Sequence, residues 1–267
     1  MVLTYLLISI ARLPAALHQM TLARSPLTGG KVTRRHGAFS RRIPLFSELT
    51  LLAFIAVPAQ ALDSTEQAPA THPDQSATTP VLLILGDSLS AAYGIPRKES
   101  WPALLLEKLQ KRALQQQKPS PTIFNASISG ETTSGGLRRL PELLLKHQPT
   151  SVIVELGAND GLRGQSLKAM RKNLLAIIHK SQQAGANVLL LGMYIPSNYG
   201  RAYVEKFHAI YGEVAQQTDS GVVDFMLEPI AFDESNFLDD RIHPNAAAQP
   251  TLLKHLWPAI NALLTTQ

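Results

Sequence analysis

The sequence has 267 residues, a length that allows one sizeable domain with extra end segments. It has no cysteine, which excludes disulfides, thiolate metal sites and a cysteine nucleophile. The formal net charge is +5, but residues 1–61 hold seven of the 25 lysines and arginines and only one of the 20 acidic residues. Residues 62–267 are therefore nearly neutral, at −1, and lack the basic surface expected of a nucleic-acid-binding protein.

The first 61 residues contain the three parts of a secretory signal. A basic pair at 41–42 precedes an apolar run at 49–57, and 59–61 supplies the small residues of a cleavage site. The run is shorter than the roughly 20 residues that span a bilayer. We therefore expect cleavage after Ala61 and export to the periplasm or the medium. A second apolar run at 2–11 suggests that the translation start is misplaced.

Residues 62–80 are rich in Thr, Pro, Ser, Gln and Ala, with almost no large apolar side chains. Such a segment cannot offset the entropy lost on ordering, so a flexible linker is expected. The folded domain is expected to occupy residues 81–267.

Short apolar runs alternate with amphipathic stretches throughout this domain. The run at 81–85 predicts a strand buried on both faces, and Ser100 is placed to cap the helix that follows. Further strands are expected at 122–126, 151–156, 188–194 and 222–226, and further helices at 134–147, 166–184, 200–218 and 246–264. This alternation predicts an α/β fold with a five-stranded parallel sheet covered on both faces. Ligands of such sheets bind beyond the carboxyl ends of the strands.

The first candidate catalytic residue is Ser88, in Gly86-Asp-Ser-Leu89 directly after the first strand. This position at the carboxyl edge of the sheet suits a nucleophile. Taken alone, these four residues are more typical of a turn, in which short polar side chains bond the local backbone. For Asp87 we favour that structural role.

Near the other end of the chain, His243 follows Asp240 by three positions. This offset can bring a carboxylate within hydrogen-bond reach of the imidazole, which makes a general base. Asp240 would hold the ring tautomer and leave the other ring nitrogen to take the Ser88 proton. The nearest alternative to Asp240 is Asp239.

Two further segments follow the second and third strands and offer oxyanion donors. The backbone N–H of Gly130 can approach a ligand closely, and Asn159 offers a side-chain amide. Together with the N–H of Ser88 they would supply three donors to an oxyanion. A loop glycine and a turn asparagine are the structural alternatives.

These motifs stand in the order and spacing of the sequence blocks of the SGNH, or GDSL, hydrolases. Over about 81–267 the chain resembles the bacterial thioesterases of that family that are also proteases, lysophospholipases and arylesterases. The resemblance implies a flavodoxin-like three-layer α/β/α sandwich. It also implies a catalytic triad of Ser88, Asp240 and His243, and an oxyanion hole of Ser88, Gly130 and Asn159. Glycine is frequent in the family where this chain has Ala158 and Arg241, which bears on substrate preference.

The same resemblance suggests residues that contact the substrate. They are Gly161, Leu162 and Arg163, in a loop that flanks the site, and Met193, Tyr194, Ile195 and Pro196, beside an acyl groove. A plain connecting loop and ordinary core packing are the alternatives. The histidines outside the triad lack metal-ligand spacing, so we expect no metal and no cofactor.

We therefore expect a serine hydrolase that cleaves acyl esters and thioesters, as an arylesterase, lysophospholipase or acyl-CoA thioesterase does. A carbohydrate or peptidoglycan O-acetylesterase or transferase of the same superfamily is the alternative. The motifs around Ser88, Gly130, Asn159 and His243 do not specify the acyl donor. A binding module that has lost its chemistry is a third interpretation. The expected partners are a small-molecule or lipid-like ester and, transiently, a membrane surface, but no nucleic acid. The simplest expected state is a monomer.

Overall fold

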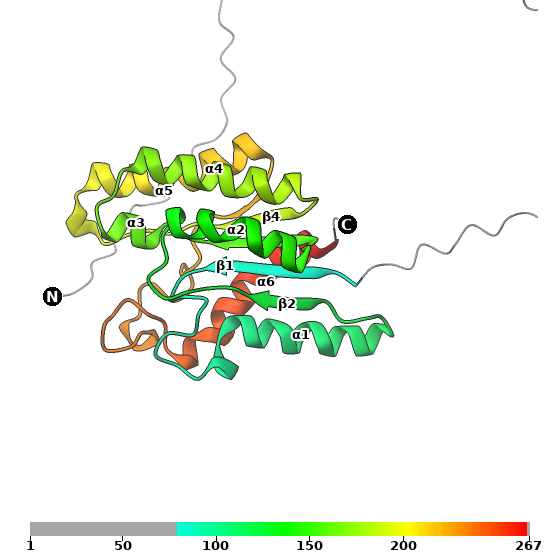
Figure 1. The fold of residues 1–267 in the computed structure, drawn as a ribbon. Coiled ribbons are helices and arrows are strands. Elements are labelled where there is room, and N and C mark those ends of the chain that lie inside the picture. Colours follow the sequence, from blue (N-terminus) through cyan, green and yellow to red (C-terminus); the bar gives the residue numbers. More distant parts are fainter. Residues whose placement is uncertain (1–78, 266–267) are drawn as a thin grey trace, which may run out of the picture. The chain divides into compact units, whose positions relative to one another are not determined.

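A computed structural model describes the chain from residue 79 to residue 265 (Figure 1). The signal segment predicted within residues 1–61 and nearly all of the predicted linker lie outside these residues. Within the described part, strands and helices alternate as the hydrophobic pattern predicts.

Five parallel strands form one sheet in the order β2-β1-β3-β4-β5. Their bounds are β1 Val81–Gly86, β2 Thr122–Asn125, β3 Ser151–Glu155, β4 Asn187–Leu191 and β5 Gly221–Val223. The central strands β1 and β3 carry unbroken apolar runs because helices cover both of their faces. The chain leaves β1 toward β2 on one side and returns to β3 on the other, which creates a crevice beyond their carboxyl ends.

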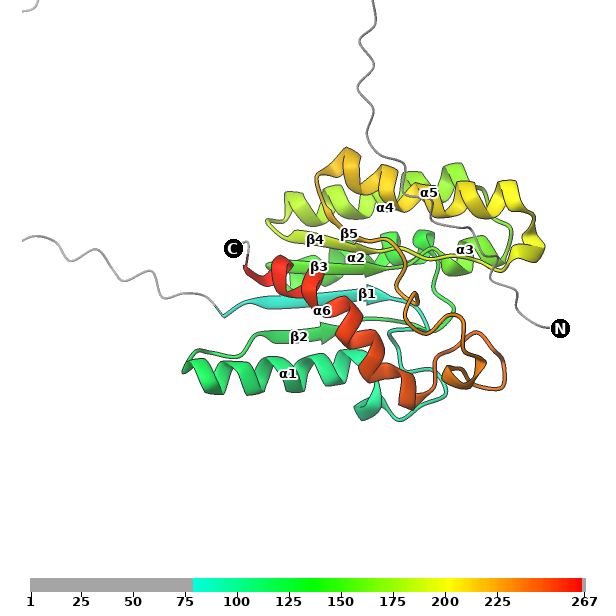
Figure 2. The same cartoon turned by 180° about the vertical axis from the view of Figure 1, so that it is seen from behind.

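The helices form two layers, one on each face of the sheet (Figures 1 and 2). One layer holds α1 (Trp101–Gln116) and α6 (Gln249–Thr265), which contact each other. The other holds α2 (Thr133–His147), α4 (Leu167–Gln183) and α5 (Arg201–Thr218). This arrangement confirms the three-layer sandwich. Among residues 79–265, no helix is both long and apolar enough to cross a membrane.

Several short helices complete the described chain. The α-helix α3 (Ala158–Leu162) follows β3 and was not predicted from the sequence. Four 3₁₀ turns lie in the connections, at η1 (Arg97–Glu99), η2 (Ser197–Tyr199), η3 (Glu234–Asn236) and η4 (Ala246–Ala248). Most of these turns lie at the carboxyl end of the sheet, where the candidate residues gather.

The predicted ends of the last two strands were wrong. β4 ends at Leu191 rather than 194, and β5 ends at Val223 rather than 226. The reason is a close backbone approach at Gly192, where a Cβ atom would lie 2.1 Å from the carbonyl oxygen of Asp224. Beyond this point the segments after β4 and β5 leave the sheet. The apolar residues that follow form the wall of a pocket.

The predicted helix cap at Ser100 was right in position but wrong in its hydrogen bond. The Ser100 hydroxyl donates to the carbonyl oxygen of Arg97 at 2.7 Å and makes no cap bond. The backbone N–H of Trp101, at the start of α1, instead donates to Oε1 of Gln249 at 2.9 Å. Because Gln249 begins α6, this bond joins the starts of α1 and α6 beside the candidate site.

Candidate active site

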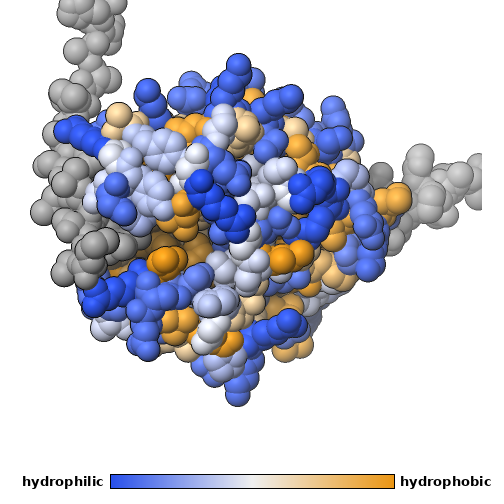
Figure 3. Space-filling model, turned by 60° about the vertical axis from the view of Figure 1, so that its left-hand side comes forward, coloured by the Kyte–Doolittle hydropathy of each residue, from blue (hydrophilic) through white to orange (hydrophobic). Residues whose placement is uncertain are grey.

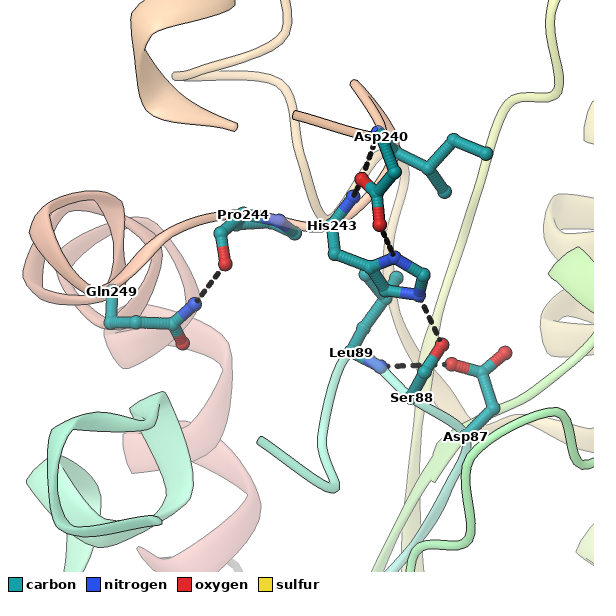
Figure 4. A network of polar contacts seen from close by, with 8 residues as sticks. Asp87, Ser88, Leu89, Asp240, His243, Pro244 and Gln249 are labelled. Carbon is teal, nitrogen blue, oxygen red and sulfur yellow. Dashed lines mark hydrogen bonds and ion pairs between the residues drawn. The ribbon is translucent and has the colours of Figure 1, made fainter. Parts of the chain in front are cut away.

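The three residues predicted as a triad lie in one hydrogen-bonded chain (Figure 4). Ser88 follows β1, and its Oγ is 2.8 Å from Nε2 of His243. Nδ1 of the same ring is 2.7 Å from Oδ2 of Asp240. A proton on Nδ1 satisfies the carboxylate and leaves Nε2 able to accept the hydroxyl proton of Ser88. This arrangement can activate a serine for attack on a carbonyl group.

A tight turn fixes the carboxylate of Asp240. Its Oδ1 accepts the backbone N–H groups of Ile242 and His243, each at 2.9 Å. Partial burial opposes ionisation, but the hydrogen bonds from His243 and Ile242 hold the pKa of Asp240 below its ordinary value. Arg241 lies within this turn at φ 57°, a left-handed conformation in which glycine carries less strain. The carboxylate that contacts the ring is that of Asp240, not Asp239.

Two residues that the sequence analysis missed hold His243 in place. The ring of Tyr93 packs against the imidazole, with ring centroids 4.3 Å apart. Gln249 donates from Nε2 to the carbonyl oxygen of Pro244 at 3.3 Å (Figure 4). Because Oε1 of Gln249 also accepts from Trp101, this side chain links the histidine loop to α1. The sequence holds no local signal for these contacts, which join segments far apart in the chain.

The two predicted oxyanion residues lie on neighbouring segments, one in the loop after β2 and one in the short helix after β3. Asn159 is in α3, and its Nδ2 donates to Oδ2 of Asp87 at 2.9 Å, which leaves one amide hydrogen for a ligand. Gly130 has φ 78°, and its carbonyl oxygen accepts from Nη2 of Arg163 at 2.9 Å. The carboxylate of Asp160 joins the two segments, because it accepts both the N–H and the hydroxyl of Thr133 at the start of α2.

Replacing Asn159 with alanine is expected to lower kcat by about 10² to 10³, the usual cost of removing one oxyanion donor. Steady-state kinetics on a soluble p-nitrophenyl ester would measure this loss, with circular dichroism to verify the fold. An increase in KM with kcat unchanged, or unchanged kinetics, would exclude Asn159 from the oxyanion hole.

A buried pair of carboxyl groups lies behind the serine. Asp87 is 1% exposed and Glu155, at the end of β3, is 0% exposed. Oε2 of Glu155 accepts the N–H of Asp87 at 3.1 Å and the hydroxyl of Ser90 at 2.8 Å. Gly86 makes room for this pair, since a Cβ atom there would lie 2.8 Å from that same oxygen. Asp87 also accepts the N–H of Leu89, which confirms its expected structural role.

Burial raises the pKa of both carboxyls. The pKa of Asp87 rises to about 6, chiefly through desolvation, which hydrogen bonds from Leu89, Glu155 and Asn159 oppose. Desolvation and the charge of Asp87 raise the pKa of Glu155 well above its ordinary value. Two like charges buried next to each other are unfavourable, so the charge on one carboxyl opposes ionisation of the other. The carboxylate of Asp87 then orients the Asn159 amide.

The raised pKa of Asp87 is expected to make the free energy of unfolding depend on pH. The folded-state pKa of Asp87, about 6, lies above its ordinary value of 3.8, so folding retains a proton that the unfolded chain releases. The resulting stability is present below about pH 4 and is lost as pH rises through 6, by about 3 kcal/mol. Urea denaturation at a series of pH values would measure the decline. We expect a smaller decline in Glu155→Gln, and equal slopes in the two proteins would contradict the coupling of the two carboxyls.

An apolar pocket of about 250 Å³ opens beside Ser88 and His243. Figure 3, turned toward the carboxyl edge of the sheet, shows hydrophobic residues in a hollow bordered by hydrophilic ones. The pocket lining joins the loops after β1, β3, β4 and β5. It consists of Asp87, Ser88, Leu89, Ala158, Asn159, Leu162, Met193, Tyr194, Ile195, Pro196, Leu227, Ile242 and His243.

The predicted substrate contacts divide into two groups. Leu162, Met193, Ile195 and Pro196 line this pocket, as the sequence analysis expected. Two others do not. Gly161 packs against Phe207, where a Cβ atom would come within 2.6 Å of the ring. The guanidinium of Arg163 instead bonds the Gly130 loop.

Tyr194 also lines this pocket, as the sequence analysis expected, whereas Leu227 and Ile242 were not predicted from the sequence. Tyr194 stacks on the ring of His208, with centroids 3.6 Å apart, so its position is well supported. The early ends of β4 and β5 turn these apolar residues toward the site, and a pattern of buried strands hides that turn. Residues 79–265 contain no cluster of three or more acidic or histidine side chains that could hold a metal ion.

Comparison with known proteins agrees with this geometry. Residues 84–249 match the model of the GDSL-like lipase/acylhydrolase family. The chain is 43% identical over 190 residues to esterase TesA of Pseudomonas aeruginosa, covering 71% of this chain and 92% of that protein. It is 42% identical over 191 residues to thioesterase 1/protease 1/lysophospholipase L1 of Escherichia coli, covering 70% and 88%.

Solved structures show the same fold. A crystal structure of TesA has a TM-score of 0.64 at 44% identity, covering 68% of this chain and 99% of that one. The esterase EstA from Pseudoalteromonas, inhibited by monoethylphosphonate, has a TM-score of 0.63 at 42% identity, covering 69% and 98%. Sequence motifs, fold and relatives therefore agree: the chain belongs to the GDSL-like, or SGNH, lipase/acylhydrolase family.

Proposed function

We propose that this enzyme hydrolyses acyl esters and thioesters through an acyl-enzyme on Ser88. The observation that carries the proposal is the hydrogen-bonded chain from Ser88 through His243 to Asp240, at the wall of an apolar pocket. Relatives at 42–43% identity are named an esterase, an arylesterase and a thioesterase, protease and lysophospholipase, which supports this class of substrates.

In the acylation step, Oγ of Ser88 attacks the carbonyl carbon while Nε2 of His243 takes its proton. The negative charge that develops on the carbonyl oxygen is stabilised by the N–H groups of Ser88 and Gly130 and by the Asn159 amide. The intermediate then collapses, and His243 gives its proton to the departing alcohol or thiol. Asp240 stabilises the imidazolium throughout, because its carboxylate remains ionised beside Nδ1.

Deacylation repeats these roles with water as the nucleophile. His243 takes a proton from the water as it attacks the acyl-enzyme, and the same three donors stabilise the second intermediate. The acid leaves and the Ser88 hydroxyl is restored. In this cycle His243 carries the protons. The backbone N–H groups and the Asn159 amide make the oxyanion contacts.

The pocket lining favours an acyl chain longer than acetyl. Met193, Ile195 and Leu162 present apolar surface beside the serine, and burial of each methylene there contributes about 0.8 kcal/mol. A carbohydrate O-acetylesterase would leave this surface without a substrate group to cover it. Medium and long acyl chains are therefore the proposed substrates.

A substrate panel tests this proposal. The purified enzyme would be assayed on p-nitrophenyl esters from acetyl to palmitoyl, a palmitoyl thioester and a lysophospholipid. We expect hydrolysis to increase from acetyl to medium or long chains. An acetyl-only profile would indicate a carbohydrate esterase, and a folded enzyme inactive on every substrate would indicate a binding module.

We also propose that the enzyme is exported, from the signal pattern in residues 1–61, and that it acts as a monomer. Fractionation of expressing cells and N-terminal sequencing of the mature chain would test export. The expected first residue is Leu62. A full-length chain retained in the cytoplasm would contradict the proposal.

A further inference from the structure

A second groove lies between α1 and α6, away from the active site. Its volume is about 620 Å³, and none of its lining residues borders the active-site pocket. The lining is formed by Leu104, Glu107, Lys108, Lys111, Arg112 and Gln115 of α1, with Pro250, Leu253, Lys254 and Trp257 of α6. Figure 2 shows the two helices side by side on the same face of the sheet.

The groove carries an excess of positive charge. Four cationic side chains line it, namely Lys108, Lys111, Arg112 and Lys254, against the single carboxylate of Glu107. Within residues 79–265, none of the four cations has a carboxylate oxygen within 4.0 Å, although other basic residues of the chain form ion pairs. Arg112 donates to the side-chain oxygen of Asn261. An ordinary solvated helix face mixes both signs of charge, whereas this one leaves its three lysines without a carboxylate partner.

An aromatic ring lies at the centre of these cations. Nζ of Lys108 is 4.5 Å from the ring centroid of Trp257, and Cζ of Arg112 is 5.8 Å from it. The Trp257 side chain is half-buried, so part of the indole reaches the surface. Leu114 is 80% exposed and follows Lys111 by three residues, on the same side of α1. The groove and its border therefore combine lysines that have no carboxylate partner with exposed apolar groups.

We propose that this groove docks the enzyme on the surface of an anionic phospholipid bilayer. Lysine and arginine bind lipid phosphates, and tryptophan prefers the boundary between headgroups and acyl chains. A soluble polyanion would use the cations but would leave Leu114 and Trp257 uncovered. Because no helix in residues 79–265 can span a membrane, such docking would be peripheral.

The groove and the active site are joined through the starts of two helices. α6 begins six residues after His243, and α1 begins at Trp101, which bonds Gln249 beside the histidine loop. The groove extends from these starts along the helices, away from the carboxyl edge where the active site opens. This inference goes beyond the proposed hydrolysis, because vesicle binding is measured without any turnover.

Vesicle sedimentation tests the groove directly. Residues 62–267 serve as the protein, because the basic, apolar leader would itself bind anionic lipid. A solved relative that is matched over 99% of its length consists of this domain alone. The triple variant Lys108→Gln, Lys111→Gln and Lys254→Gln is compared with Lys168→Gln, Lys172→Gln and Lys180→Gln on α4. The second variant loses the same charge on the opposite face of the sheet.

We expect the protein to bind vesicles of phosphatidylcholine and phosphatidylglycerol, and to bind vesicles of phosphatidylcholine alone much more weakly. The groove variant is expected to lose roughly 100-fold in partitioning, since each cation near an anionic surface contributes about five-fold. The α4 variant is expected to retain most of its binding. Equal losses in the two variants, or equal binding to neutral vesicles, would overturn the proposal.

Tryptophan fluorescence gives an independent readout. The chain has two tryptophans, and Trp101 is fully buried, so a shift on vesicle addition reports Trp257. We expect a blue shift with anionic vesicles that disappears in Trp257→Phe; a shift that persists in that variant would contradict docking through the groove. Hydrolysis of a soluble p-nitrophenyl ester is expected to be unchanged in both lysine variants. The proposed docking and the proposed hydrolysis are therefore tested by separate measurements, and either proposal can be contradicted without the other.

Discussion

Replacing Ser88 with alanine is expected to lower kcat for ester hydrolysis by about 10⁶, because the variant can form no acyl-enzyme. The hydroxyl lost is the one 2.8 Å from Nε2 of His243, and no neighbouring group replaces it as a nucleophile in the triad. Stopped assays at high enzyme concentration would measure the residual rate. The folded state is expected to be retained, because the substitution removes one oxygen atom at a pocket wall.

A matched control and a labelling experiment sharpen this test. Ser134 is an exposed serine on α2, and Ser134→Ala is expected to keep full activity. A phosphonate ester should add its mass to the wild-type protein and to Ser134→Ala, but not to Ser88→Ala. Labelling of the Ser88 variant, or activity within ten-fold of the wild type, would place the nucleophile elsewhere.

The substitution Asp240→Asn is expected to lower kcat by about 10⁴ while leaving the fold intact. The asparagine carbonyl can still accept the N–H groups of Ile242 and His243, which directs its NH₂ group at Nδ1 of the ring. That contact favours the tautomer with its proton on Nε2. Because this nitrogen faces Ser88 and already carries a proton, it cannot accept the hydroxyl proton. The variant therefore keeps the geometry and loses the base.

The neighbouring Asp239 provides the matched control. It is exposed, and the contact with the ring is made by Asp240. Asp239→Asn is expected to retain wild-type kcat and KM under the conditions in which Asp240→Asn is measured. Comparable losses in both variants would show that the effect is one of local charge rather than of the ring tautomer.

The sequence predicted the sheet, and it predicted that Ser88, Asp240 and His243 lie together, because both depend on short patterns. The apolar runs of β1 and β3 mark strands buried on both faces, and the alternation with helices requires a parallel sheet. In such a sheet, residues just after the strands meet at one edge, which brings Ser88 and Asn159 together. The three-residue spacing of Asp240 and His243 is itself enough to permit their hydrogen bond.

Features that depend on contacts between distant segments were not predicted. Glu155 is a lone carboxylate in an apolar strand, a signal that was available, but its pairing with Asp87 needs the β1–β3 register. The link from Gln249 to Trp101 spans 148 residues and leaves no local pattern. The basic groove was hidden for the same reason, since its lysines come from the first and last helices of the domain.

The acid and base of the triad lie within one turn, whereas the serine stands 155 residues earlier in the chain. Asp240 and His243 can therefore assemble early and locally, but they have nothing to activate until the two ends of the domain close on each other. A shift of about 1 Å at such a junction can cost 100-fold in rate. Esterase activity is therefore expected to fall when the C-terminal segment is displaced from β1, even while the rest of the fold is retained.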